Sequence, residues 1–158
     1  MSVIHDRLRS AGLELPRYQQ LPSDFPRVRT LAVGELLFVS GHGPDAPEFP
    51  RLRGKVGGDL DVQAGRQAAR QTALNMLSTI DHEIGFARIA RMVKVLGMVR
   101  SADGFGAQPT VIDAASEVFL TAFGRDVGIH TRSAVGMAEL PDGIPVEIEL
   151  QAQLLPLM

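Results

Sequence analysis

The sequence predicts an α+β fold in which a mixed sheet carries two helices on one face. Apolar residues recur at helical spacing over residues 62–84 and 111–122, whereas residues 28–40, 89–99 and 146–154 have the composition and alternation of strands. Strands and helices in this order are typical of one sheet with a helical layer. Such a layer leaves the other sheet face bare, so we expect a partner subunit to cover it.

Length and composition indicate a single domain. The chain has 158 residues, of which 45% are apolar and 22% are charged, enough for one core and too few for two. We therefore interpret residues 1–158 as one domain, with an N-terminal arm or short helix at 1–25 and a core at 26–155. The absence of cysteine excludes disulfides, cysteine-ligated metals and thiol nucleophiles. No signal-peptide pattern and no run of about 18 apolar residues is found, so we expect a soluble, cytoplasmic protein that does not bind membranes.

Charge and aromatic content argue against nucleic-acid binding. The formal net charge is −2, with one tyrosine and no tryptophan, whereas nucleic-acid binders usually show a basic face with stacking aromatics. The four histidines have no short metal-ligand spacing, so we expect no metal site. The stretch Gly54–Gly58 precedes a helix but lacks the Gly-Lys-Ser/Thr order of a phosphate-binding loop.

The first half of the chain divides at glycines and prolines. Residues 28–40 predict a hairpin around the two-residue turn Gly34-Glu35. Residues 41–58 contain five glycines and three prolines and predict a loop. Asp59 is expected to cap a long helix, and Gly85 stands where a helix-ending glycine is expected.

The second half predicts a strand, a helix and two further strands. Residues 89–99 are apolar at both odd and even positions, which indicates a central strand covered on both faces. Pro109 opens a second helix that Gly124 is expected to end. Two strands at 133–138 and 146–154 are expected to pair as a hairpin around a Pro-Asp-Gly turn.

Arg132 and Glu147 are the residues best suited to chemistry. An arginine at the start of a strand offers a two-pronged clamp for a carboxylate, and a glutamate on a partly covered sheet face can have a raised pKa suited to proton transfer. We expect them to meet across a subunit boundary and not within one hairpin. A structural interpretation stays open, in which Arg132 pairs with a surface glutamate while Glu147 and Glu149 form a solvated strand face.

Short motifs in a fixed order and spacing resemble the RidA/YjgF family, also called endoribonuclease L-PSP, over about residues 25–155. They are Val39-Ser40-Gly41, Gly58-Asp59-Leu60, Gln67 with Leu74-Asn75, Val93-Lys94-Val95, Arg132-Ser133-Ala134-Val135, Leu140-Pro141 and Val146-Glu147-Ile148-Glu149. The N-terminal arm and the stretch 123–136 are most similar to the family's longer, chorismate-mutase-like branch. The resemblance implies a chorismate-mutase-like fold and a homotrimer, with the sheets around the centre and clefts between subunits.

The same resemblance implies an activity and a site. Members hydrolyse reactive enamine or imine acids, such as 2-aminoacrylate, to a 2-keto acid and ammonia, with neither metal nor organic cofactor. Arg132 falls on the arginine that holds the substrate carboxylate and Glu147 on the glutamate that orients water, which implies these two as catalytic residues. The implied substrate-binding positions are Phe25, Gly41, His42, Asp113, His130, Ser133 and Ala134.

Four positions depart from the family pattern. Phe25 replaces the site tyrosine, Asp113 a helix asparagine, Ala134 a reactive cysteine and His42 the glutamine that follows Ser-Gly. These changes leave open an alternative, in which a noncatalytic trimer binds small carboxylates or acts as a chaperone-like or regulatory partner. Ribonuclease activity follows only from the family's older name, and the acidic composition disfavours it.

Overall fold

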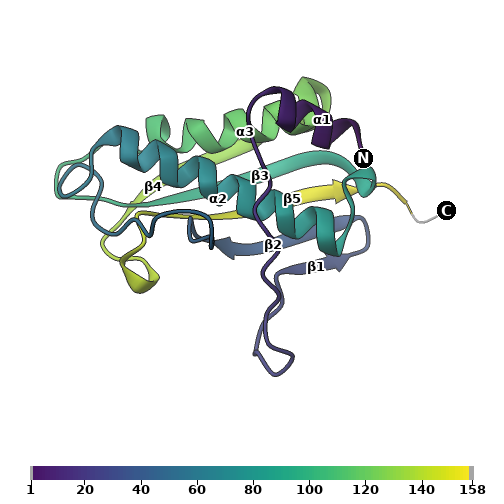
Figure 1. The fold of residues 1–158 in the computed structure, drawn as a ribbon, viewed down its shortest axis with the longest axis horizontal. Coiled ribbons are helices and arrows are strands. Elements are labelled where there is room, and N and C mark those ends of the chain that lie inside the picture. Colours follow the sequence, from purple (N-terminus) through teal and green to yellow (C-terminus); the bar gives the residue numbers. More distant parts are fainter. Residues whose placement is uncertain (1, 157–158) are drawn as a thin grey trace.

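The structure, a computed structural model that describes residues 2–156, is a five-stranded sheet with three α-helices on one face (Figure 1). This arrangement confirms the predicted α+β class and the mixed sheet. The elements are α1 (Val3–Ser10), β1 (Thr30–Val33), β2 (Leu36–His42), α2 (Val62–Glu83), β3 (Ile89–Arg100), α3 (Gln108–Gly128), β4 (Thr131–Met137) and β5 (Val146–Leu154), with 3-10 turns at Phe86–Arg88 and Pro141–Gly143.

The strand order β1-β2-β5-β3-β4 corrects one predicted pairing. The hairpin β1–β2 is present as expected, but β4 and β5 are not hairpin partners, because β3 lies between them. Leu96 of β3 pairs with Ser133 of the parallel β4 on one side and with Glu149 of the antiparallel β5 on the other. The crossover through α3 brings β4 alongside β3 in the parallel direction, and the 3-10 turn then carries the chain across to the far side of β3.

Helix α2 begins two residues later than predicted. Its N-cap is Asp61, whose side chain accepts a hydrogen bond from the backbone N–H of Ala64 at 2.8 Å. Asp59 instead accepts from the backbone N–H of Lys55 at 3.1 Å. A bridge between Val56 and Leu60 keeps residue 60 extended, so the helix cannot start before it. The expected C-terminal glycine, Gly85, follows the helix with φ 85°.

Helix α3 continues beyond its predicted end. Gly124 does break the helical dihedral angles, with φ 72° and ψ 174°, but helical turns resume and α3 ends at Gly128. The arm begins with the short helix α1, which packs against α3 and buries Leu8. A contact of 2.8 Å between His5 Nε2 and an oxygen of Asp81 joins α1 to α2, so a third helix joins the two that were predicted.

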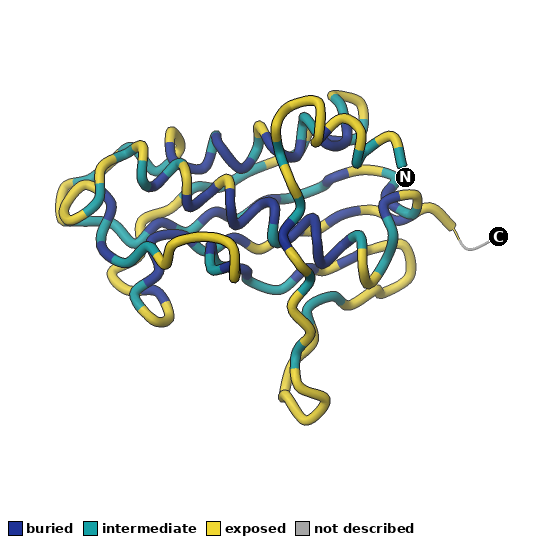
Figure 2. The backbone as a smooth tube through the Cα atoms, viewed as in Figure 1, coloured by how far each residue is buried: buried dark blue, intermediate teal, exposed yellow. Residues whose placement is uncertain are grey.

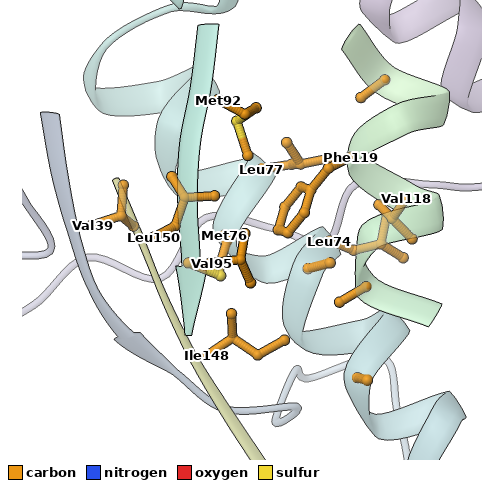
Figure 3. Close-up of a cluster of buried hydrophobic side chains, with 14 of the residues drawn as sticks. Val39, Leu74, Met76, Leu77, Met92, Val95, Val118, Phe119, Ile148 and Leu150 are labelled. Carbon is orange, nitrogen blue, oxygen red and sulfur yellow. The ribbon is translucent and has the colours of Figure 1, made fainter. Parts of the chain in front are cut away.

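The hydrophobic core lies between the helices and the sheet. Figure 3 shows side chains from both layers interleaving there, and Figure 2 shows buried segments in both the helices and the strands. Burying each large apolar side chain contributes about 1.5–3 kcal/mol. The labelled members are Val39, Met92, Val95, Ile148 and Leu150 from strands and Leu74, Met76, Leu77, Val118 and Phe119 from helices.

The opposite sheet face carries exposed apolar side chains. Leu31 is 57% exposed and Val33 is 59% exposed, whereas Leu37, which points to the helical side, is fully buried. Phe38 pairs with Leu31 in the hairpin, and it is also exposed. The sheet therefore has one covered and one uncovered face in this chain, and the partner subunit expected on the uncovered face stays a prediction.

Candidate functional site

A cleft of about 340 Å³ lies where β2 ends, and we call it the β2 cleft. Segments from four parts of the chain form its walls: residues 16–29, the end of β2, the middle of α2 and the turn before β5. The lining residues used below are Arg17, Tyr18, Arg27, Arg29, Gly41, His42 and Asn75.

Hydrogen bonds to α2 fix the arm as one wall of the cleft. The hydroxyl of Ser78 donates to the backbone carbonyl of Pro16 at 2.8 Å, and the hydroxyl of Tyr18 donates to Glu83 at 2.6 Å. The ring of Tyr18 also stacks on His82, with 4.0 Å between centroids. Hydrogen bonds and ring stacking with α2, which is far away in the sequence, thus hold the arm in place. The cleft beside the arm therefore has a defined shape.

His42 forms part of the cleft wall and is itself buried, with 5% of its surface exposed. Its Nδ1 lies 2.6 Å from the carbonyl of Ser40, and its Nε2 lies 2.9 Å from the hydroxyl of Thr79. A carbonyl only accepts, so Nδ1 carries the proton and Nε2 accepts from Thr79. Burial lowers the pKa of His42 to about 4, which keeps the ring neutral. Both ring nitrogens are therefore already engaged.

The carboxyl group of Glu147 lies against the α-carbon of Gly41. Any side chain at position 41 would collide with this carboxyl, so the glycine is needed for space. Burial raises the pKa of Glu147, the neighbouring Glu149 raises it further, and Arg27 opposes both effects. Within residues 2–156 no hydrogen bond to the Glu147 carboxyl is present. A half-buried carboxyl with a raised pKa is suited to proton transfer.

Arg132 lies on the helical side of the sheet, where the chain itself supplies its partners. One guanidinium nitrogen donates to Asp113 at 2.8 Å and to Ser116 at 3.2 Å, and the other donates to the carbonyl of Pro109 at 3.4 Å. The side chain is 21% exposed. Arg132 thus forms an ion pair, as the structural interpretation expected, but its partner is an aspartate on α3 and not a glutamate.

His130 belongs to the same network. Its Nδ1 lies 2.7 Å from the carbonyl of Gly128, so it donates there, and its Nε2 accepts from the hydroxyl of Ser116 at 2.9 Å. Burial lowers the pKa of His130. We call the group Arg132, Asp113, Ser116 and His130 the Arg132 edge. Sequence reasoning missed Ser116, although its place three residues after Asp113 puts both on one face of a helix.

The remaining expected site residues lie elsewhere. Ser133 accepts a hydrogen bond from Lys94 at 2.9 Å, and Ala134 packs on the core. Phe25 is 44% exposed, and the guanidinium of Arg27 lies 5.2 Å from the centre of its ring.

The structure therefore brings the expected residues together as two groups and not as one. Gly41 and His42 line the β2 cleft, and the Glu147 carboxyl contacts Gly41 without lining the cleft. Arg132, Asp113 and His130 meet at the Arg132 edge. Arg132 is paired with Val95 and Glu147 with Met98 of β3. Positions three apart on a strand face opposite sides of the sheet, so one chain cannot aim both side chains into one site.

Sequence reasoning also missed the arginines of the β2 cleft. Arg27 and Arg29 lie two residues apart in an irregular stretch before β1, in which residues 26, 27 and 29 are bends. That spacing was the available signal, but only the folded arm shows that they reach the same cleft as His42.

Metal binding and membrane spanning were also searched for in the described residues. Among residues 2–156, no group of three or more His, Asp and Glu side chains has the arrangement that a metal ion requires. In the same part of the chain, no helix has both the length and the hydropathy to cross a bilayer.

Comparison with known proteins agrees with the resemblance seen in the motifs. The family described as endoribonuclease L-PSP matches residues 20–154. Protein TCP17 of Trypanosoma cruzi is 34% identical over 148 residues, covering 93% of this chain and 91% of the relative.

Solved structures give the same result. The crystal structure of Agrobacterium tumefaciens Atu1372 is similar with a TM-score of 0.85 and 35% identity, covering 96% of this chain and 92% of that one. The YjgF protein of Escherichia coli shares the fold with a TM-score of 0.58 and 24% identity, over 83% of this chain and 90% of its own. The chain belongs to the endoribonuclease L-PSP family, also known as RidA/YjgF.

Proposed function

We propose that this protein is a hydrolase that deaminates reactive enamine or imine acids of the 2-aminoacrylate type, giving a 2-keto acid and ammonia. The observation that carries the proposal is the Glu147 carboxyl, which is half-buried, has a raised pKa and has no hydrogen-bond partner among residues 2–156. A carboxyl whose pKa is raised by burial holds its proton more readily than an exposed one, so it can give a proton and take one back during a reaction. No metal or organic cofactor is needed for such a reaction.

The proposed reaction has two stages. Protonated Glu147 gives its proton to C3 of the enamine, which yields the imine, and the resulting carboxylate then takes a proton from water as the water oxygen bonds to C2. Glu147 then gives the proton it took from water to the amino nitrogen, the C–N bond breaks to release ammonia, and the C2 hydroxyl returns a proton to Glu147 as the C2 carbonyl of the keto acid forms. Arg132 holds the substrate carboxylate and so fixes C2 in place.

The proposed active site is shared between copies of the chain. Arg132 and Glu147 lie on opposite faces of the sheet in one protomer, so a complete site would combine Arg132 from one copy with Glu147 from the next. The exposed apolar side chains on the uncovered sheet face support an assembly through this face. We propose a homotrimer with three such sites.

The test is release of ammonia and keto acid from freshly generated 2-aminoacrylate. We expect turnover by the wild type and loss of turnover in Arg132→Ala. The matched control is Arg66→Ala, because the Arg66 side chain is as exposed as that of Arg132, at 21%, and forms a similar ion pair with Glu117 of α3 at 3.0 Å. No release by the wild type would refute the deaminase, and so would equal losses in both variants.

A second function, noncatalytic binding of small carboxylates, is favoured by one observation. The Arg132 guanidinium is already paired with Asp113, which neutralises part of the charge that would hold a substrate. Calorimetry with 2-ketobutyrate and benzoate distinguishes the two functions. Tight binding without turnover of 2-aminoacrylate would favour the binding protein over the enzyme.

A further inference from the structure

Arg17, Arg27 and Arg29 all line the β2 cleft. None of them forms an ion pair with a carboxylate within residues 2–156. Asp45 also lines the cleft, but Arg53 already holds it in a two-pronged pair at 2.9 and 2.7 Å, which lowers the pKa of Asp45. Asp142 is the other carboxylate in the cleft wall, so three arginines face two carboxylates, one of which is already paired.

The charge of Arg27 acts on Arg29, and Tyr18 and Glu83 act on Arg29 in the opposite direction. Arg29 is half-buried, and its Nε donates to the carbonyl of Gln19 at 2.8 Å, while its two terminal nitrogens have no acceptor among the described residues. Burial lowers the pKa of Arg29 and the charge of Arg27 lowers it further. Two like charges beside one cavity repel each other, and an anion between them would remove the repulsion.

The position of these arginines relates them to the proposed reaction. The charge of Arg27 acts on Glu147, and the charges of Arg27 and Arg29 act on His42. Gly41, against which the Glu147 carboxyl lies, is part of the cleft wall. Glu147 itself does not line the cleft, but Gly41 and Arg27 relate it to the cleft wall, so a molecule bound at Glu147 would enter the cleft past these two residues. The cleft volume of about 340 Å³ falls within the usual range for small-molecule pockets.

We propose that the β2 cleft binds a second carboxylate of the substrate, so that the preferred substrates are imine or enamine dicarboxylic acids and not monoacids such as 2-aminoacrylate. This inference rests on the proposed function. The first carboxylate pairs with Arg132 of a neighbouring copy, and the distal carboxylate pairs with Arg27 and Arg29. A guanidinium donates two parallel hydrogen bonds to a carboxylate, which suits both ends of such an acid.

Calorimetric titration of the full-length protein tests this proposal without depending on turnover. The probes are 2-oxoglutarate, which has two carboxylates, and 2-ketobutyrate, which has one. We expect 2-oxoglutarate to bind at least about tenfold more tightly to the wild type, as charge-assisted hydrogen bonds imply. Equal affinities would overturn the inference even if the wild type deaminates 2-aminoacrylate.

Variants assign the preference to the cleft. Arg27→Gln changes an exposed side chain, so folding is preserved, and it should reduce the preference for 2-oxoglutarate severalfold, while Arg27→Lys should retain most of it. Adding Arg29→Gln should remove the rest. Arg125→Gln, at an exposed position in the last turn of α3, is the matched control and should leave the ratio unchanged. A preference that survives the double substitution would overturn the proposal.

Inorganic phosphate separates a dicarboxylate site from a phosphate site. We expect phosphate at equal concentration to displace little 2-oxoglutarate, because it cannot span both carboxylate positions. Full displacement would overturn the assignment to a dicarboxylic acid. Absence of deamination together with a clear 2-oxoglutarate preference would contradict the proposed enzyme while leaving the cleft's ligand class supported.

Discussion

The Arg132 edge and the β2 cleft differ in how completely their polar groups are paired. At the Arg132 edge, Asp113, Ser116 and His130 all have hydrogen-bond partners within the chain. Glu147, which contacts Gly41 of the cleft wall, has no such partner among residues 2–156. In the β2 cleft, Arg27 and Arg29 form no ion pair with a carboxylate in the same part of the chain. A ligand adds little binding free energy to polar groups that are already paired, whereas it adds much to charges that have no partner. The comparison therefore predicts that substitutions at Glu147 and the β2 cleft change function more than substitutions of the residues that pair with Arg132.

The sharpest test of this difference is Glu147→Gln. We expect turnover to fall by about 10²–10⁴-fold, as for loss of a general acid–base group, measured with 2-aminoacrylate. Because burial raises the pKa of Glu147, the folded state binds more protons than the unfolded state just above pH 4.5, and wild-type stability falls as pH rises there. The glutamine variant should escape this cost and be more stable at pH 7.

Glu149→Gln is the control for that experiment. Glu149 lies two positions further along β5, on the same sheet face, and is exposed. It should change turnover only slightly. Equal losses in both variants would mean that the general charge of this strand matters and that Glu147 has no special role.

His42 offers a test of the buried side of the cleft. Its pKa is lowered from 6.5 to about 4, so the unfolded state binds the extra proton between these pH values. Stability is therefore complete above pH 6.5 and is lost as the pH falls toward 4, by up to about 3 kcal/mol. Denaturant unfolding across this range should show a shallower loss for His42→Gln than for the wild type.

The exposed His82 provides the comparison, because His82→Gln removes the ring that stacks on Tyr18 but leaves His42 and its partners Ser40 and Thr79 in place. It should retain the steep pH dependence of the wild type. If wild type and His42→Gln lose stability in parallel, the buried neutral ring is not the origin of the acid sensitivity.

Gly41→Ala separates catalysis from stability in the same region. The added methyl would collide with the Glu147 carboxyl, which is the end of a flexible side chain and can move aside. We expect turnover to fall by up to about 100-fold, because a displacement of about 1 Å is that costly to positioning, with little change in denaturant midpoint. A large loss of stability would show that the carboxyl cannot move and would contradict this view of Gly41.

The smallest expected effect is at the Arg132 edge. Asp113→Asn removes the charge that partly neutralises Arg132 while keeping a hydrogen-bond acceptor, so affinity for 2-ketobutyrate should rise by about tenfold. Glu117→Gln on the same helix, which loses only the exposed pair with Arg66, should have no effect on this affinity. Weaker binding by Asp113→Asn would mean that the aspartate orients Arg132 for its ligand.

The sequence predicted which segments form helices and strands better than it predicted which strands are adjacent in the sheet. Periodicity located α2 and β3 well, but it carries no information on which strands are adjacent, so the pairing of β4 with β3 was missed. Two aspartates, Asp59 and Asp61, are equally good caps by composition. Only the bridge at Leu60 decides between them.

The candidate site shows the same limit. Arg132 and Glu147 were identified from their motifs, but the ion pair of Arg132 with Asp113 joins residues 19 apart through packing of a helix on a strand. The burial of His42 depends on an irregular register in β2 between Val39 and His42, which turns the ring inward and leaves no mark on the residue pattern.

The missing side chain at position 41 has a consequence for comparing relatives. Gly41 does not have a positive φ, so selection for glycine there would reflect the room taken by a neighbouring acid and not the flexibility of the main chain. A homologue with a bulkier residue at this position must carry its glutamate elsewhere. The residue at this single alignment position would then distinguish relatives whose glutamate lies in the candidate site from relatives that share only the fold.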